Sequence, residues 1–270
     1  MKAMVAVSAV VALGLVTGCG VGDGGAAGEP RRASPSRTDR TDRGEGKEAL
    51  DAVTMLGPDR LRRVELGAHE VPGFQIERAG EGAAGAGRPR TDSEPCRPLA
   101  DALGSQLRPA PAVTVVRTFA KTGEDMDFEG LMGMIRVSAY EGDGAADTLR
   151  ALRTAATACA DGFRMRTGEG EPQEFEAVRT LPPPSLGDEA VAFRLENVAE
   201  RAPSLITAVR SGNMLAMFFA TSLSDPDGVE IPPALVRAQV AKLRGVAGEA
   251  SSQASAAPGE DDDEDADPSG

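Results

Sequence analysis

The sequence predicts an α+β fold in a single domain of about 200 residues, within a chain of 270 residues. Valine- and threonine-rich stretches with alternating apolar residues run through the middle of the chain, and such stretches are typical of β-strands. Ser211-Gly212-Asn213 separates two of these stretches and has the composition of a tight hairpin turn. Two other stretches carry apolar residues three and four positions apart, the spacing of a helix with one buried face.

The expected strands are short stretches that either alternate or are apolar throughout: 74–77, 112–119, 132–140, 163–167, 175–180, 190–196, 205–210 and 214–221. In one of them, Val191, Phe193 and Leu195 fall on the same face. The stretch 214–220 is apolar on both faces, so we expect it to be a central strand of the sheet. The prolines at 182–184 should end the strand before them, because proline has no N–H to donate to a neighbouring strand.

The clearest expected helix starts after Asp143, which can cap it, and ends before Gly162. Its apolar stripe faces the core and consists of Leu149, Leu152, Ala156 and Cys159. A last helix starts at Pro232 and Pro233, and its buried stripe consists of Val236, Val240, Leu243 and Ala247. A shorter helical stripe lies at 48–56, and the glycine- and proline-rich stretch 81–94 is expected to be a loop.

The start of the chain has the pattern of a bacterial export signal. Lys2 precedes an uncharged apolar run over residues 3–16, which is too short for an ordinary transmembrane helix. The run ends in Val16-Thr17-Gly18-Cys19, which resembles the bacterial lipobox, where a cysteine receives lipid and becomes the new N-terminus. We therefore expect a signal peptide at 1–18 and a lipoprotein diacylated at Cys19, carrying palmitate and held on the extracytoplasmic face of the cell membrane. The alternative is ordinary secretory cleavage beside an unmodified thiol.

Two segments flank the expected domain at 47–248. Residues 19–46 are rich in Gly, Ser, Pro, Arg and Asp without apolar periodicity, so we expect a flexible tether. Its arginines could rest on anionic lipid, but the interleaved acidic residues favour a solvated linker. Residues 249–270 are strongly acidic and are expected to form a disordered tail.

Charge and aromatic content exclude some classes of partner. The net charge of −13 argues against binding to nucleic acid, because Lys and Arg contacts to phosphate supply most of that affinity. Trp is absent and Tyr140 is the only tyrosine, so the sequence lacks the aromatic platforms that stack on bases or sugars. The expected partners are the membrane, through the N-terminal lipid, and a small-molecule or cell-envelope ligand, with no nucleic acid.

The chain has three cysteines, and two of them remain once Cys19 carries lipid. Cys96 and Cys159 then have only each other as partners in an oxidising compartment outside the membrane. We expect a disulfide between them. The alternative is two buried free thiols.

The motifs point to a protein that is not an enzyme and holds neither a metal nor a cofactor. His69 is the only histidine and precedes a Val-Pro-Gly turn, so we expect a surface residue and not a general base or metal ligand. Residues 225–228, Asp-Pro-Asp-Gly, look like part of a calcium loop but lack the later bidentate glutamate, and a simple turn explains them. The sequence contains neither a Gly-x-Ser-x-Gly elbow nor a Cys-His pair for nucleophilic catalysis.

Several short motifs together resemble one protein family. The first group is Val71-Pro72-Gly73-Phe74, Cys96-Arg97-Pro98-Leu99 and Ala158-Cys159-Ala160-Asp161-Gly162-Phe163. The second group is Leu186-Gly187-Asp188-Glu189-Ala190 before a strand, followed by Val209-Arg210-Ser211-Gly212-Asn213. Together they resemble the extracellular sensor domain of PknH-type actinobacterial receptor kinases, which also occurs alone in actinobacterial surface lipoproteins.

This resemblance spans residues 47–247. It implies an α+β fold with an antiparallel β-sheet and packed helices, a cleft, disulfide support, and ligand sensing without catalysis. The chain departs from the family in its cysteines, because the kinase sensor has two disulfides and this sequence can form one. It also contains neither a kinase domain nor a transmembrane helix, so the resemblance does not extend to signal transmission.

We therefore expect a membrane-anchored extracytoplasmic lipoprotein that acts as a non-catalytic sensor or ligand-binding module. The cleft implied by the resemblance should lie on the sheet face near Tyr140, Asp188 and Arg210, because strand ends beside loops commonly present polar groups to ligands. Asp188 and Glu189 can instead simply accept hydrogen bonds from backbone N–H groups. Two alternatives stay open: a structural or interaction lipoprotein of the cell envelope, and an extracellular hydrolase.

Overall fold

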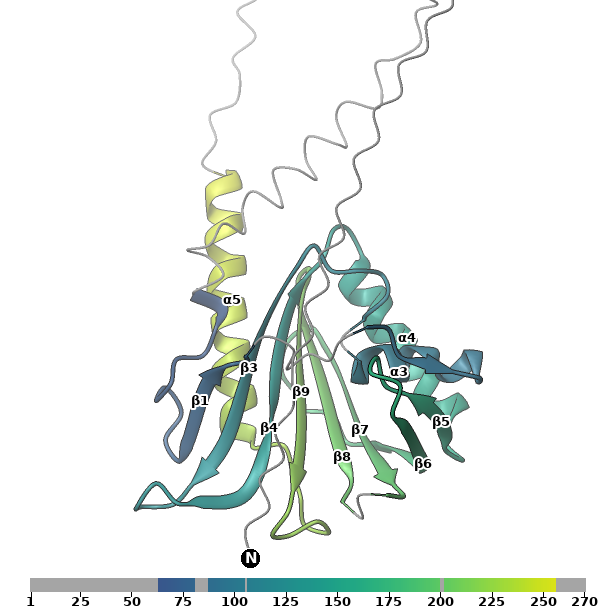
Figure 1. Ribbon diagram of the computed structural model, residues 1–270. Coiled ribbons are helices and arrows are strands. Elements are labelled where there is room, and N and C mark those ends of the chain that lie inside the picture. Colours follow the sequence, from purple (N-terminus) through teal and green to yellow (C-terminus); the bar gives the residue numbers. More distant parts are fainter. Residues whose placement is uncertain (1–62, 81–86, 105, 200–201, 256–270) are drawn as a thin grey trace, which may run out of the picture. The chain divides into compact units, whose positions relative to one another are not determined.

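The computed structural model describes residues 63–80, 87–104, 106–199 and 202–255 (Figure 1). All of them belong to one compact unit of the chain. The expected signal peptide, Cys19, the tether, the helical stripe at 48–56 and the part of the acidic tail from 256 onward lie outside the described residues.

The described residues form one nine-stranded antiparallel sheet, in the order β1-β3-β4-β9-β8-β7-β6-β5-β2. Its strands are β1 Phe74–Arg78, β2 Arg90–Thr91, β3 Val113–Thr122, β4 Phe128–Ala139, β5 Phe163–Arg166, β6 Pro172–Leu181, β7 Glu189–Asn197, β8 Ser204–Ser211 and β9 Met214–Ser222. The antiparallel arrangement confirms the expected α+β class. The end of β6 at Leu181, directly before the three prolines, confirms their expected effect.

β9 is the fourth strand in this order, between β4 and β8, which confirms the expectation of a central strand. Its side chains alternate between two hydrophobic cores, one on each face of the sheet. Leu215 and Met217 belong to one core, whereas Ala216 and Phe218 belong to the other. The strand is apolar on both faces because both faces are covered at this position. Its two-residue turn to β8, through Gly212 and Asn213, is the expected hairpin.

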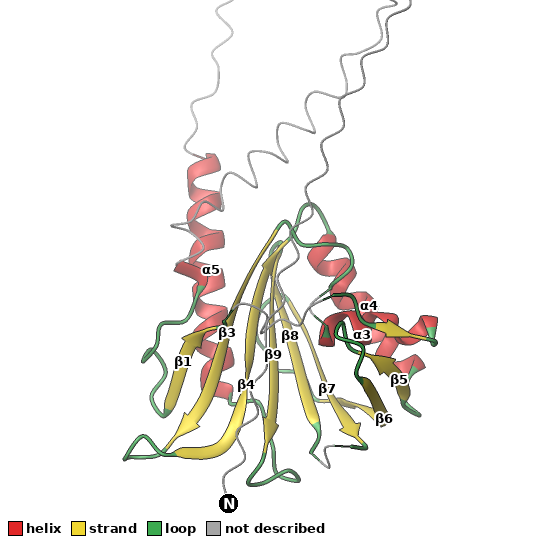
Figure 2. Cartoon of the chain, in the orientation of Figure 1, coloured by secondary structure: helices red, strands yellow, loops and turns green. Residues whose placement is uncertain are grey.

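Helices cover both faces of the sheet (Figure 2). On one face, α5 (Pro233–Ser255) packs on β8 and β9, and Leu235, Val236, Val240 and Leu243 are buried there. The Gln239 side-chain amide, also buried, donates a hydrogen bond to the Val64 carbonyl. On the other face, α3 (Arg97–Leu103) packs on α4 (Gly144–Ala158), and α4 packs on β6, β7 and β8.

The structure corrects the sequence-based elements in two places. The expected loop over 81–94 contains the two-residue strand β2, which pairs with β5, and it leads into a 3-10 turn (Glu94–Cys96) and helix α3. A helix of seven residues is too short to show a repeating apolar stripe, although Pro98 near its start and its Ala and Leu residues favour it. In addition, α5 continues to Ser255, past the expected start of the tail at 249, because Ala, Gln and Glu in this stretch favour helix.

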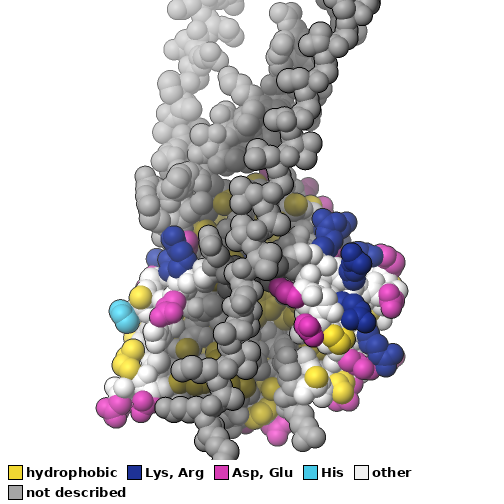
Figure 3. Space-filling model, viewed as in Figure 1, with side chains coloured by type: hydrophobic (Ala, Val, Ile, Leu, Met, Phe, Trp, Pro, Cys, Tyr) yellow, Lys and Arg dark blue, Asp and Glu magenta, His cyan; other side chains and the backbone are white. Residues whose placement is uncertain are grey.

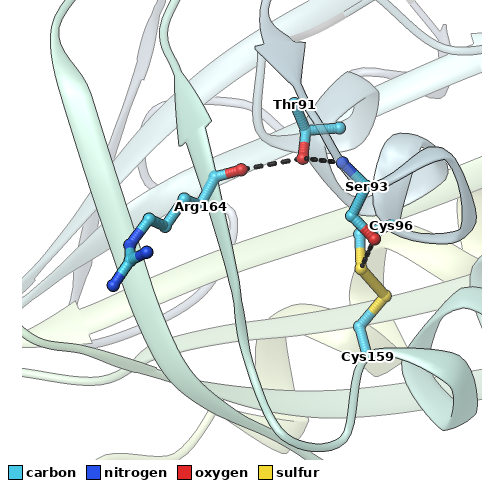
Figure 4. Close-up of a disulfide and its surroundings, with 5 residues drawn as sticks. All are labelled: Thr91, Ser93, Cys96, Cys159 and Arg164. Atoms are coloured by element: carbon cyan, nitrogen blue, oxygen red, sulfur yellow. Dashed lines mark hydrogen bonds between the residues drawn. A yellow bond between two sulfur atoms is a disulfide. The ribbon is translucent and has the colours of Figure 1, made fainter.

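Cys96 and Cys159 form a disulfide with Cα atoms 5.8 Å apart (Figure 4), which confirms the expected pairing. Cys96 ends the 3-10 turn before α3, and Cys159 directly follows α4. Both residues are buried in the core beneath these helices. The Ser93 hydroxyl donates to Cys96 Sγ at 3.0 Å, and the Thr91 hydroxyl donates to the Arg164 carbonyl of β5 at 2.7 Å. The bond therefore ties α3 to α4, and the adjoining turn ties both to the edge of the sheet.

Reduction of this disulfide should lower the free energy of unfolding by about 4 kcal/mol in the chain-entropy model, because the bond joins residues 63 positions apart. Denaturant unfolding with and without reductant measures the loss. A Cys96→Ser/Cys159→Ser double variant should be as stable as the reduced protein and should not respond to reductant. An unchanged midpoint for the native chain in reductant would contradict the prediction.

Candidate functional site

One described cavity is an open hollow of about 580 Å³ on the sheet face that carries α3 and α4. We call it the sheet hollow. Its described lining comes from β1, β3, β4 and β9, with one residue each from α3 and β8: Gln75, Glu77, Leu103, Thr118, Phe119, Ala120, Met132, Gly133, Met134, Arg136, Ser204, Phe219, Ala220 and Thr221. A volume of this size is within the range of small-molecule sites.

The hollow exists because the helices cover only part of this sheet face. α4 packs on β6, β7 and β8, and the face continues over β9, β4, β3 and β1 beyond it. Alternate residues of a strand share a face, so Met132, Met134 and Arg136 form one row along β4. Phe219 of β9 lies opposite Met134 in the register and extends the apolar surface. Met132 is 39% exposed, which is high for a large apolar side chain in a sheet.

Arg136 stands at the inner wall of the hollow and is only 2% exposed. One guanidinium nitrogen donates to the Ala102 carbonyl in the last turn of α3 at 2.8 Å. The guanidinium carbon lies 4.8 Å from the centre of the Phe219 ring, a cation–π geometry, and a second nitrogen lies 3.9 Å from the Met134 sulfur. Burial lowers the pKa of Arg136 to about 10, so the side chain stays protonated at neutral pH.

The rim of the hollow at the outermost strand, β1, carries a carboxylate. This residue, Glu77, pairs with Thr118 of β3, which pairs with Met134, so it lies two strands to the side of the β4 row. Glu77 is exposed and accepts a hydrogen bond from the Gln75 amide at 2.6 Å. Between this rim and Arg136, the described surface is mostly methionine, phenylalanine, leucine and alanine. Such a surface can bind an apolar group and can distinguish ligands by the charge at their ends. Two charged groups so placed offer neither a nucleophile nor a paired acid and base.

Gly133 lies in the floor of the hollow, between Met132 and Met134. A Cβ at this position would lie 2.0 Å from the Phe219 carbonyl oxygen and 2.5 Å from the Phe119 ring. The ring of Phe119 therefore fills the space beneath the strand, where it also makes an edge contact with Phe74 at 6.2 Å between ring centres. Glycine lets the sheet stay closely packed under an open surface.

The structure brings Asp188 and Arg210 together, as an ion pair of 3.2 Å beside the β8–β9 hairpin. Asp188 also accepts from the Gly212 N–H at 2.7 Å, and Arg210 donates to the Gly212 carbonyl at 3.1 Å. Glu189 continues the cluster, with oxygens 2.6 Å from Arg153 of α4 and 3.8 Å from Arg210. For Asp188 the structure thus shows the alternative, a carboxylate that accepts from a backbone N–H, and the cluster joins α4 to the hairpin.

Tyr140 is near the same hairpin through its backbone, because its N–H donates to the Asn213 carbonyl and its carbonyl accepts from the Asn213 amide, both at 3.0 Å. Its ring is 2% exposed and packs in the core under α4, and burial raises the pKa of its hydroxyl. Tyr140, Asp188 and Arg210 lie outside the described lining of the sheet hollow. A ligand cleft at these three residues stays a prediction.

The other candidate residues from the sequence lie on the surface or form turns. His69 is exposed, as expected. Asp225 accepts from the Gly228 N–H at 3.0 Å, which is the expected turn. Within the described ranges there is no group of three or more potential metal-ligating side chains, and no helix there combines the length and apolarity needed to cross a bilayer.

A second described cavity, of about 430 Å³, lies beside the three prolines 182–184 and the start of α5. Its sheet residues include Leu205, which pairs with Ala220 and so shares the face covered by α5. This cavity is therefore on the opposite face of the sheet from α3 and α4.

Sequence reasoning missed the sheet hollow because it sought polar groups at strand ends. A signal was present in residues 131–136, Leu-Met-Gly-Met-Ile-Arg. Two flexible methionines on one face of a strand, beside a glycine and before an arginine, are unusual for a surface packed by a helix. Methionine is common at surfaces that adapt to apolar ligands.

Similarity to known proteins is found at the level of structure. No family model and no curated protein matches this chain. The extracellular domain of PknH from Mycobacterium tuberculosis matches with 12% identity and a TM-score of 0.47, covering 71% of this chain and 96% of that chain. An uncharacterised protein (Rv0999 ortholog) from Mycobacterium smegmatis matches with 13% identity and a TM-score of 0.30, covering 73% of this chain and 94% of that chain. The first match agrees with the PknH-type resemblance of the sequence motifs. A likeness of this size concerns the course of the chain and does not extend to a ligand or a site.

Gly133→Ala should lower the free energy of unfolding by about 1–3 kcal/mol, because the added methyl group must displace the Phe119 ring or the β9 backbone. Gly245→Ala in α5 is a matched control, since a Cβ at that position would have no other atom within 4 Å. That change should instead raise stability by about 0.5–1 kcal/mol through helix propensity. Urea unfolding of both variants measures the change in the free energy of unfolding for each. A Gly133→Ala protein as stable as the native one would contradict the packing argument.

Proposed function

We propose that this chain is a lipid-anchored extracytoplasmic protein that binds an apolar ligand in the sheet hollow and acts as a non-catalytic sensor or binding module. The hollow carries this proposal: it is open, has a volume of about 580 Å³, and is lined mainly by apolar side chains from four neighbouring strands. Exposed contiguous apolar surface is costly in water, so it commonly marks a place where something binds.

The position outside the membrane is supported by two features of the sequence and one of the fold. Residues 1–18 have the pattern of an export signal, and the lipobox-like motif ends in Cys19. The Cys96–Cys159 disulfide suits an oxidising compartment, since the cytosol keeps most thiols reduced. The expected tether at 19–46 would hold the domain near the membrane.

A binding role without catalysis is supported by the chemistry of the hollow. Arg136 is engaged with Ala102, Met134 and Phe219, and Glu77 lies at the outer rim with Gln75. The side chains of Asp188 and Arg210 form hydrogen bonds with backbone groups of the hairpin. In neither place are two titratable groups arranged as an acid and a base about a shared open position.

Met132→Glu should weaken binding of a neutral apolar dye, such as Nile red, by about tenfold or more, because it places a charge in the apolar surface. Met132 is already 39% exposed, so the variant should fold. Met126→Glu is the matched control, since Met126 is 57% exposed in the turn between β3 and β4 and outside the described lining. Dye fluorescence titrations measure both. Equal binding of the dye by both variants would remove the hollow as the ligand site.

Cys19→Ser should move the protein from the membrane fraction to the soluble fraction, because two acyl chains hold a protein on a bilayer and none remain in the variant. Fractionation and intact-mass analysis measure the change. The Cys96→Ser/Cys159→Ser variant should stay in the membrane fraction and keep the mass of the lipid. Membrane retention of Cys19→Ser without added lipid mass would show that the anchor is elsewhere.

A further inference from the structure

We infer that the sheet hollow takes a single-chain anionic amphiphile of the fatty-acid type, with its head group at the Arg136 end and its chain over Met134 and Met132. The inference rests on the proposed function, because it names the chemical class of ligand for the same site.

The first support is the shape of the apolar surface. Met132, Met134 and Arg136 are alternate residues of one strand, so the row from Met132 to Arg136 is about 13 Å long at about 3.3 Å per residue. Ala120 and Phe219 lie on either side of the row, opposite Met132 and Met134 in the register of β3 and β9. A strip with this arrangement matches one extended alkyl chain better than a compact ring system.

The second support is the sign and position of the charge at one end of the strip. The Arg136 guanidinium touches the Met134 sulfur and the Phe219 ring, and both of these side chains line the hollow. The cation therefore lies directly behind the apolar surface and not in bulk water. Charges interact several times more strongly in such surroundings than in water, so Arg136 should favour an anion at this end.

The third support is the β1 side of the hollow, where Glu77 is exposed and hydrogen-bonded to Gln75. Glu77 pairs with Thr118, which pairs with Met134, so it lies two strands to the side of the strip. Water and salt screen a charge in this position, so it attracts a cationic head group weakly. The hollow is thus asymmetric, with a desolvated positive charge inside and a solvated negative charge at the rim. This asymmetry favours an anionic head group over a cationic one on the same chain.

The test compares two amphiphiles that share a chain and differ in charge: sodium dodecanoate and dodecyltrimethylammonium, each below its micelle concentration. By isothermal titration calorimetry on the native chain, dodecanoate should bind about tenfold tighter or more. Across octanoate, decanoate and dodecanoate, affinity should rise by up to about fourfold for each CH₂ added, because burial of one CH₂ contributes about 0.8 kcal/mol. Affinity should level off once the chain exceeds the length of the strip.

Variants at Arg136 test whether this side chain causes the preference for the anionic amphiphile. Arg136→Met should abolish the advantage of dodecanoate over the cationic amphiphile, whereas Arg136→Lys should keep it. Because Arg136 also binds the Ala102 carbonyl, circular dichroism and thermal unfolding must show that each variant is folded. The comparison of the two amphiphiles on the native chain needs no variant, and it stays decisive if Arg136→Met does not fold. Met132→Glu should weaken dodecanoate binding, and Met126→Glu should not.

The outcomes separate this inference from the proposed function. Equal affinity for the two amphiphiles, or a preference for the cation, overturns the anionic head group, while Nile red binding to the hollow would still support the proposed function. Dodecanoate binding that Met132→Glu leaves unchanged also overturns the inference, because the ligand would then lie elsewhere. Absence of binding by Nile red and by both amphiphiles overturns the inference and the proposed function together.

Discussion

The Cys96–Cys159 bond is the constraint on which the arrangement of this sheet face depends. It joins the start of α3 to the end of α4, so the two helices are held as a pair where α4 packs on β6, β7 and β8. The far end of α3 is held separately, because the Ala102 carbonyl accepts from Arg136 on β4. With α3 attached at both ends, Leu103 forms a side of the hollow, and the sheet surface beyond it stays open.

Arg136 connects the packing of the fold with the chemistry of the hollow. Burial of a guanidinium is unfavourable, which is the reason for its lowered pKa, and the carbonyl and ring contacts offset part of that cost. A residue that served only to hold α3 could be smaller and neutral. The same contacts that hold the helix also fix the cation behind Met134 and Phe219, where its field reaches the open surface. Structural support and ligand preference thus come from one side chain.

The sequence predicted those elements whose apolar pattern has a single interpretation. Alternation at Val191, Phe193 and Leu195 marks a strand with one face in the core, and all three are buried in the core under α4. The spacing of apolar residues alone could not reveal the hollow, because Met132 and Met134 have the same spacing as side chains that face a helix. Whether a partner covers them depends on where α3 and α4 dock, and that follows from contacts distant in sequence. Asp188 and Arg210 were recognised as a pattern, but their partners, the Gly212 backbone groups, become evident only when the hairpin closes.

The outermost strands of the sheet affect whether several copies of the protein associate through their sheet edges. In the described part of the chain, the sheet ends in β2, which has two residues, and in β1, which has five. Arg90 of β2 lies opposite Arg166 of β5, and Figure 3 shows Lys and Arg side chains interspersed with Asp and Glu on the side of the molecule where Figure 1 places α3 and β5. Two copies that approach by this edge meet charged side chains and a strand that is too short to pair with. If the proposed lipid anchor holds the molecules on one surface, they are concentrated far above their level in solution. An edge that resists pairing would then let them stay separate, each with its own hollow.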